Sequence, residues 1–218
     1  MCSSDLQRET RSLGWQLGLA LSLTVGGAAL LSLFWTPWDT AQLSVVQRLR
    51  APDTQHWLGT DQLGRDLLSM LMQGAASSLG VALVATLGGL ALGLPLGLWA
   101  AARGGWVDEL VMRASDVLFA FPSLLLAVLA ATVLGPGERS AEVAIAVFNV
   151  PVFARVVRGG AQALWTRDFV LAARLAGKGP WHISLGHVLP NLAGLLWVQV
   201  SVQLSMGLLA EEIGRSHV

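Results

Sequence analysis

The chain has 218 residues, of which 54% are hydrophobic and 13% are charged, and its formal net charge at pH 7 is zero. The charged share is about half that of an average soluble domain, so we expect a membrane protein. The lack of net positive charge argues against a nucleic-acid partner. The single cysteine, Cys2, excludes a disulfide within the chain. At about 20 residues per crossing, the chain has room for about five membrane spans.

The first apolar run covers residues 14–35. It is uncharged, and tryptophans lie near its two ends, where we expect the membrane interfaces: Trp15 and Trp35. We predict a first transmembrane helix here, preceded by a polar, cytoplasmic N-terminal segment at residues 1–13. Residues 36–78 follow as the one long polar region, which we expect to be an extracytoplasmic loop.

Residues 79–102, the second expected span, are uncharged and include Pro95. Three glycines four residues apart predict a face on which a neighbouring helix packs backbone to backbone: Gly89, Gly93 and Gly97. The alternative is that glycine is simply frequent in membrane helices. After a short link at residues 103–113, residues 114–134 form the third expected span, which Pro122 can bend.

Two later spans carry side-chain amides. The fourth expected span, residues 141–157, contains Asn149, and the fifth, residues 191–210, contains Gln199 and Gln203 one turn apart on the same face. An amide in a membrane helix needs a partner, because lipid offers none. Each of these amides therefore either bonds a neighbouring helix or lines a translocation path.

The basic residues predict the orientation, because lysine and arginine are enriched on the cytoplasmic side of a membrane. They crowd the N-terminal segment, the link after the second span and the loop before the last span: Arg8, Arg11, Arg103, Arg113, Arg155, Arg158, Arg167, Arg174 and Lys178. We therefore expect a cytoplasmic N-terminus, a cytoplasmic loop at residues 159–190 and a membrane core at residues 79–211.

Signals for catalysis are missing from the sequence. There is no phosphate-binding GxxxxGK[ST] pattern, and no nucleophile or carboxylate pair has a catalytic context. His182 and His187 are five residues apart, whereas two metal ligands on one helix face are four apart. We expect no catalytic residue, no metal site and no cofactor, so the energy for any transport has to come from a partner.

The segment at residues 169–191 interrupts the apolar pattern. Its first half predicts a short helix that Gly177 ends, and one face carries mostly small side chains: Phe169, Ala172, Ala173 and Ala176. Residues 181–188 predict a second short helix, and Pro190 suits the opening turn of the fifth span. Another protein can approach the backbone of an alanine face closely, so this segment predicts a docking surface.

Two alanines, a glycine and a final Leu-Pro pair have the spacing of the EAA loop of ABC importer permeases, which this segment resembles. In that family the loop is the cytoplasmic coupling helix, which lies in a groove of the ATP-hydrolysing subunit. The acidic position of the motif falls on Leu171 here, and its isoleucine position falls on His187. The resemblance implies an ATPase-coupling role for these positions: Phe169, Leu171, Ala172, Ala173, Gly177, His187, Leu189 and Pro190.

The string HWLGTDQLGRDLLS at residues 56–69 has a plain physical interpretation, which is a folded loop whose aspartates cap short helices. It is also similar to the segment that follows the first span in the dipeptide, oligopeptide and nickel branch of these permeases. The resemblance implies scaffold or receptor-side positions outside the membrane: Gly59, Thr60, Asp61, Gly64, Arg65 and Asp66.

The resemblance covers nearly all of residues 50–211. It implies an all-α, polytopic transmembrane bundle with the MetI-like permease fold, in which five spans are present and the sixth is missing. The implied function is import of peptides, nickel or a related small solute across the bacterial inner membrane. The implied partners are a second homologous permease chain, two ATP-binding cassette ATPase subunits and an extracytoplasmic solute-binding protein. Residues 1–6 and 212–218 match no such pattern, and our hypothesis is that they are not native.

Two other classes of membrane protein remain as alternatives. A secondary transporter or channel subunit driven by an ion gradient is expected to carry acids at mid-depth and internal repeats, and the sequence shows neither. A membrane assembly subunit without a translocation path of its own would need only the glycine-rich packing face.

Overall fold

The computed structural model describes residues 3–135 and 137–215, and these are α-helices joined by loops, with one isolated bridge between Thr60 and Asp66. The chain divides into two compact units, one ending at Gly80 and the other beginning at Val81. The expectation of an all-α fold is confirmed. The helices are α1 Ser3–Ser32, η1 Val45–Gln47, α2 Leu67–Arg103, α3 Gly105–Ala120, α4 Ser123–Leu134, α5 Glu138–Trp165, α6 Asp168–Leu175, α7 Pro180–Ile183, η2 Ser184–Val188 and α8 Leu189–Arg215.

Several described helices are long and apolar enough to cross a membrane: Gly14–Ser32, Leu67–Arg103, Glu138–Trp165 and Pro180–Leu209. Helices α3 and α4 pass the same test together, with a bend of 89° between them. Counted as one bent span, this pair brings the described crossings to five, the number that the sequence predicted.

Helix α2 begins at Leu67, so the last part of the stretch at residues 36–78, which the sequence assigned to a loop, is helical. The reason is the cap at its start. Oδ2 of Asp66 accepts a hydrogen bond of 2.8 Å from the backbone N–H of Ser69, which is an N-cap interaction. The residues after this cap are uncharged and mostly apolar or small, so the helix starts well before the stretch that hydropathy assigns to the membrane.

The expected link at residues 103–113 is also wrong, because α3 begins at Gly105. Gly104 and Gly105 have φ values of 61° and 52°, which glycine adopts without steric cost, so the chain passes from α2 to α3 within these residues. The expected third span is not one straight helix. Phe121 has extended backbone, as residues before proline do, and Pro122 then separates α3 from α4.

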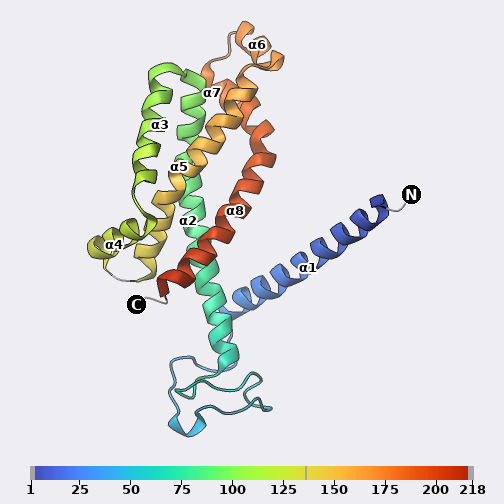
Figure 1. The fold of residues 1–218 in the computed structure, drawn as a ribbon, viewed down its shortest axis with the longest axis vertical. Helices are drawn as coiled ribbons and strands as arrows, with labels where there is room; N and C mark the ends of the chain where they lie inside the picture. Colours follow the sequence, from blue (N-terminus) through green and yellow to red (C-terminus); the bar gives the residue numbers. More distant parts are fainter. Residues whose placement is uncertain (1–2, 136, 216–218) are drawn as a thin grey trace. The chain divides into compact units, whose positions relative to one another are not determined.

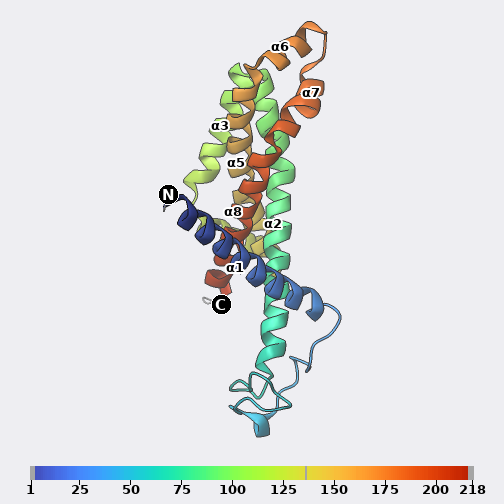
Figure 2. The ribbon, with the colours of Figure 1, turned by 90° about the vertical axis from the view of Figure 1, so that its right-hand side faces the viewer.

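In the second unit, α5 packs against α2, α3, α4 and α8. Figure 1 and Figure 2 show the last turns of α2 and the long helices α3, α5 and α8 side by side. A Cβ atom at Gly93 would lie 2.6 Å from the carbonyl oxygen of Val150, and one at Gly97 would lie 2.6 Å from that of Ala154. A Cβ atom at Gly89 would collide with Cβ of Asn149 and lie 3.1 Å from its carbonyl carbon. The three glycines therefore let α2 approach α5 at backbone distance.

The helices α7, η2 and α8 follow one another without a break, whereas the sequence predicted a separate helix at residues 181–188 and a new span from residue 191. Pro190 lacks an N–H, and in an α-helix its ring would clash with the carbonyl of Gly186. The wider π turn lies at this place, with the N–H of Leu189 bonded to the carbonyl of Ser184. The chain thus continues through the proline instead of ending a helix before it.

Candidate functional site

The loop between α5 and α8 contains α6, α7 and η2, and it lies at the end of the second unit opposite α4 (Figure 1, Figure 2). Helix α6 ends in a Schellman motif. The N–H of Gly177 donates to the carbonyl of Arg174 at 2.9 Å, and the N–H of Lys178 donates to that of Ala173 at 3.1 Å. Gly177 has φ of 77°, the left-handed conformation that this motif requires. The helix stop predicted at Gly177 is therefore confirmed.

The inner face of this loop is buried against the ends of three spans. Val170 is 0% exposed and Ile183 is 1% exposed. They belong to one apolar core with residues of the loop and of α2, α5 and α8: Leu98, Val157, Ala161, Trp165, Ala173, Val188 and Leu192. Burying one such side chain stabilises a fold by about 1.5–3 kcal/mol, so the loop is firmly attached to these three spans.

The outer face of α6 carries exposed apolar side chains. Leu175 is 91% exposed, and Phe169 and Leu171 are exposed as well. Of the face that the sequence predicted for docking, Phe169, Ala172 and Ala176 are exposed, but Ala173 is buried, so the prediction is wrong for Ala173. The exposed surface also includes Leu171 and Leu175. Periodicity could not choose between the two faces, because Val170 and Ala173 also have helical spacing.

Two side-chain contacts fix the loop further. The guanidinium carbon of Arg174 lies 4.8 Å from the centroid of the Trp165 ring, a cation–π contact between α6 and α5. The Nζ atom of Lys178 lies 2.9 Å from Nε2 of His187 and donates to this ring nitrogen. Because Lys178 follows α6 and His187 belongs to η2, this bond closes the turn between them.

The side-chain amides of α5 and α8 meet each other. Nε2 of Gln203 donates to Oδ1 of Asn149 at 2.6 Å, and Nε2 of Gln199 lies 3.5 Å from Oε1 of Gln203. Asn149 and Gln203 are both buried within the second unit. This arrangement favours bonding between helices over path lining for Asn149 and Gln203.

The sequence did not predict two ion pairs between α3 and α5. Arg158 binds both carboxylate oxygens of Asp108, with 2.5 Å from Nη2 to Oδ2. Nη2 of Arg155 lies 2.6 Å from Oδ1 of Asp116. The two aspartates are eight residues apart and lie on one side of α3, and the arginines are three apart on α5. This spacing places each pair of charged residues on one side of its helix, but it does not predict which two helices pack together.

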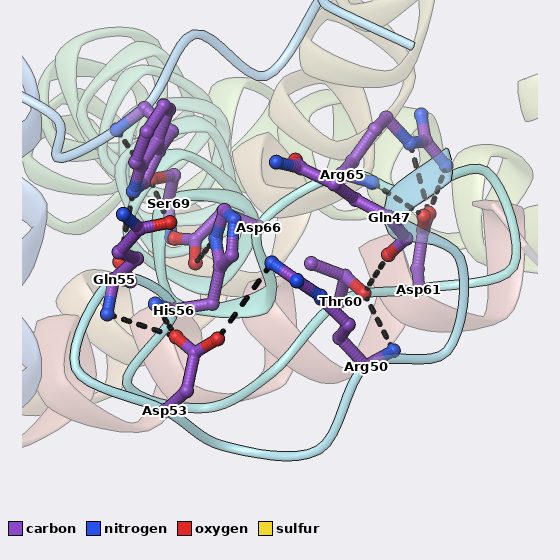
Figure 3. A network of polar contacts seen from close by, with 11 residues as sticks. Gln47, Arg50, Asp53, Gln55, His56, Thr60, Asp61, Arg65, Asp66 and Ser69 are labelled. Atoms are coloured by element: carbon purple, nitrogen blue, oxygen red, sulfur yellow. Dashed lines mark hydrogen bonds and ion pairs between the residues drawn. The ribbon is translucent and has the colours of Figure 1, made fainter. Parts of the chain in front are cut away.

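In the first unit, the polar segment before α2 folds into a hydrogen-bonded network (Figure 3). Oδ2 of Asp66 accepts bonds of 2.8 Å from both the N–H and the hydroxyl of Ser69, and its Oδ1 lies 3.1 Å from Nδ1 of His56. The side chains of Asp66 and His56 are each 2% exposed. Burial alone would raise the pKa of Asp66, but the bonds from Ser69 and His56 outweigh it and lower the pKa.

The other polar residues of the motif also bond within the loop. The N–H of Arg65 donates to Oδ1 of Asp61 and lowers the pKa of Asp61, and Nη2 of Arg65 lies 2.8 Å from Oδ2 of Asp61. The hydroxyl of Thr60 donates to the carbonyl of Gln47 and accepts a bond of 2.9 Å from the N–H of Arg50 (Figure 3). These bonds favour the scaffold interpretation of the motif.

The two motif glycines are required by the backbone. Gly59 and Gly64 both have φ of 78°, and a Cβ at either would collide with the backbone of Arg50 or Ser44. In the part of the chain that the structure describes, no group of three or more His, Cys, Asp or Glu side chains is placed to hold a metal ion. The motif therefore has the geometry of a folded loop whose acids cap and brace it.

Comparison with known proteins adds a family match. The model of a family described as binding-protein-dependent transport system inner membrane component matches residues 93–211. This range includes α3 to α6, the turn at Gly177 and most of α8.

Three curated relatives are similar over most of the chain. The glutathione transport system permease protein GsiD of Pectobacterium atrosepticum is 37% identical over 81% of this chain and 60% of the relative. The dipeptide transport system permease protein DppC of Alkalihalophilus pseudofirmus is 40% identical over 74% of this chain and 53% of the relative. The nickel transport system permease protein NikC of Escherichia coli K12 is 39% identical over 85% of this chain and 69% of the relative. The chain thus matches only part of the length of these relatives.

Proposed function

The chain belongs to the family of binding-protein-dependent transport system inner membrane components, and on this premise we propose that it is a permease subunit of an ABC importer. The family and the apolar helices make it a multi-pass membrane protein. In this proposal the chain itself is not catalytic, and partner subunits hydrolyse the ATP.

The observation that carries the proposal is the two-faced loop between α5 and α8. Its inner face is part of the core that holds the ends of α2, α5 and α8 together. Its outer face exposes apolar side chains: Phe169, Leu171, Leu175, Trp181 and Leu185. Exposed apolar side chains gathered on one loop are typical of a protein interaction site, which in this proposal docks into a groove of an ATP-binding subunit.

The attachment of the loop provides a route for mechanical coupling. When two ATP-binding subunits close, a displacement of α6 passes through the buried Val170 to α5, and a displacement of α7 passes through η2 into α8. These spans then move between an arrangement open to the outside and one open to the cytoplasm. A loop without a buried inner face would bend instead of moving its spans.

We further propose the setting of this importer. The named relatives transport glutathione, dipeptide and nickel, which supports a small peptide, nickel or a related solute as substrate. The partners are a second homologous permease chain, two ATPase subunits and an extracytoplasmic solute-binding protein. Basic residues at the α6 end of the second unit support a cytoplasmic loop and, with the crossings counted, a cytoplasmic N-terminus.

Co-purification and uptake test this proposal together. Tagged chain expressed in its own cells is expected to bring down an ATP-binding subunit, and Gly177→Asp is expected to lower uptake, because a side chain at φ of 77° costs about 1–2 kcal/mol and disturbs the end of α6. The control is Gly179→Asp, since Gly179 has φ of −72° at the N-cap of α7, where aspartate is favourable.

The permease proposal is wrong if no ATPase co-purifies and Gly177→Asp leaves uptake intact. Uptake that persists without the ATPases, but stops when a protonophore collapses the ion gradient, would instead support the alternative of an ion-gradient-driven secondary transporter.

A further inference from the structure

The segment at residues 43–49 in the first unit, which we call the apolar finger, exposes large apolar side chains. Val46 is 94% exposed, Val45 is 76% exposed and Leu49 is 70% exposed. Val45 and Val46 lie in the 3-10 turn η1, which buries none of its residues. These side chains make no contribution to the packing of this loop. Exposed apolar side chains gathered in this way are typical of a surface that binds a partner.

The backbone of the finger is strained at Leu49. Its φ is 52°, and no other non-glycine residue of the described chain has a positive φ. A bulky side chain in this conformation costs about 1–3 kcal/mol and persists only where the surroundings hold it. Here the N–H of Leu49 donates to the carbonyl of Asp61 at 3.0 Å, and the N–H of Ser44 donates to that of Leu63 at 3.1 Å. Leu49 therefore combines a strained backbone with an apolar side chain that is exposed.

Arg48 adds a positive charge to the finger. Its Nε donates to the carbonyl of Gln62 at 2.6 Å, and no carboxylate among the described residues pairs with it. The other arginines of this loop are paired, Arg50 with Asp53 and Arg65 with Asp61. The finger therefore combines an apolar tip with one cation that no carboxylate of the described residues neutralises.

The length of α2 argues against lipid as the partner of this finger. Helix α2 has 37 residues, which is about 55 Å at 1.5 Å per residue, whereas the hydrocarbon core is about 30 Å thick. Arg103 marks its last turn, and about 20 residues before it are enough to cross the core. The first turns of α2 then lie beyond the hydrocarbon. The finger bonds to the residues directly before these turns, so it faces an aqueous compartment.

We propose that the apolar finger docks into a water-soluble protein whose surface offers an apolar depression with carboxylates beside it. This inference rests on the proposed function, under which that protein is the extracytoplasmic solute-binding protein. The family description itself names dependence on a binding protein. In this proposal the exposed side chains of Val45, Val46 and Leu49 fill the depression, and Arg48 pairs with a carboxylate at its rim.

Photocrosslinking in the assembled transporter tests the contact directly. The full chain, in cells that carry its partners, receives the photoreactive residue p-benzoylphenylalanine at position 46 or, as a control, at position 58, where Leu58 is exposed outside the finger. A product at position 46, identified by mass spectrometry as a solute-binding protein and absent at position 58, is the expected result. A product with lipid or with the second permease chain, any other product, or none overturns the proposal.

Uptake by substituted transporters gives the second arm. Val46→Asp is expected to lower uptake about tenfold or more, as for a residue at the centre of an interface. Arg48→Glu is expected to weaken binding of the solute-binding protein and to abolish its loss of affinity at high salt. The control Leu58→Ser is expected to stay within about twofold of the native rate. Normal uptake by Val46→Asp and Arg48→Glu would overturn the inference.

The amount of co-purified ATPase separates this failure from failure of the proposed function. If the ATPase binds normally to Val46→Asp while uptake is unchanged, only the finger inference is wrong. If no ATPase binds to the native chain, the proposed function itself is wrong. Because Val46 is almost fully exposed, its substitution leaves the fold and ATPase binding intact.

Discussion

Gln203 of α8 donates a hydrogen bond of 2.6 Å from Nε2 to Oδ1 of Asn149 in α5, and both side chains are buried. Helices α5 and α8 flank the candidate coupling loop, so this bond joins the two spans that would move with it. An amide that loses its partner inside a membrane protein finds no water to replace it. Breaking the bond therefore costs more than the bond contributes on balance.

A double-mutant cycle measures this bond. Asn149→Leu and Gln203→Leu are each expected to lower the free energy of unfolding by about 1–3 kcal/mol, because each leaves one buried amide unpaired. The double variant is expected to recover about 0.6–1.7 kcal/mol relative to the sum of the single changes. The measurement is reversible unfolding of the purified chain in lipid–detergent bicelles. Strict additivity would show that the two amides do not interact.

Gly93→Ala tests the close contact between α2 and α5. The added Cβ would lie 2.6 Å from the carbonyl oxygen of Val150 and 2.7 Å from Cβ of Phe153, and neither atom can move without its helix. We expect a loss of about 1–3 kcal/mol in unfolding free energy. The control is Gly80→Ala in the same helix, where no heavy atom lies within 4 Å of the new Cβ. Equal stability of the two variants would contradict this packing.

Substitutions at Gly177 separate backbone strain from steric conflict. No heavy atom lies within 4 Å of a Cβ built at this residue, but its φ is 77°. The cost of a side chain is therefore conformational, about 1–2 kcal/mol for alanine and less for asparagine, which tolerates this region. The expected order of thermal stability of the purified complex is Gly, then Asn, then Ala, then Val. An order that follows side-chain volume alone would reject the argument.

The membrane crossings were predictable because hydropathy along a short window decides them. The helix starts were less so. Helix α2 extends to Leu67 through uncharged but weakly apolar residues, and hydropathy reports where a membrane core lies, not where a helix begins. Likewise, residues 105–113 are helical although they carry charge, because the chain turns at Gly104 and Gly105, where α3 begins.

The candidate site was predictable in part. The helix stop at Gly177 follows from local backbone chemistry, which the sequence carries in full. The inward face of α6 could not be predicted in this way. Val170 and Ala173 are buried in one core with Ile183 and Trp165, which come from other elements. The ion pairs of α3 with α5 likewise join residues 39 and 50 positions apart in the chain.

The pair of Asp108 and Arg158 is expected to stabilise the contact of α3 with α5. Arg158→Ala is expected to lower the free energy of unfolding by about 1.5–3 kcal/mol. Arg158→Lys keeps the charge but cannot bind both carboxylate oxygens, so its expected loss is smaller than that of Arg158→Ala. The control is Arg113→Ala, whose pair with Glu109 is exposed and is expected to change stability by less than about 1 kcal/mol. Thermal unfolding in nanodiscs measures all three. A loss for Arg113→Ala equal to that for Arg158→Ala would contradict the ranking.

The folded loop before α2 is expected to lose stability in acid. The bonds from Ser69 and His56 lower the pKa of Asp66 in the folded state despite its burial. A carboxyl with a lowered pKa contributes stability above its unfolded pKa, near 4, and loses it as the pH falls through the folded value. Hydrogen exchange of residues 56–69, corrected for the intrinsic rate, should therefore accelerate below about pH 4.

Two substitutions of Asp66 test this assignment. Asp66→Asn keeps an N-cap acceptor but cannot ionise, so its exchange should depend less on pH. The pH dependence that remains is due to Asp53 and Asp61, whose pKa values are also lowered. Asp66→Ala loses the cap and should exchange faster at every pH, by the equivalent of about 0.5–2 kcal/mol. If Asp66→Asn retains the full acid sensitivity of the native loop, Asp66 is not the group responsible.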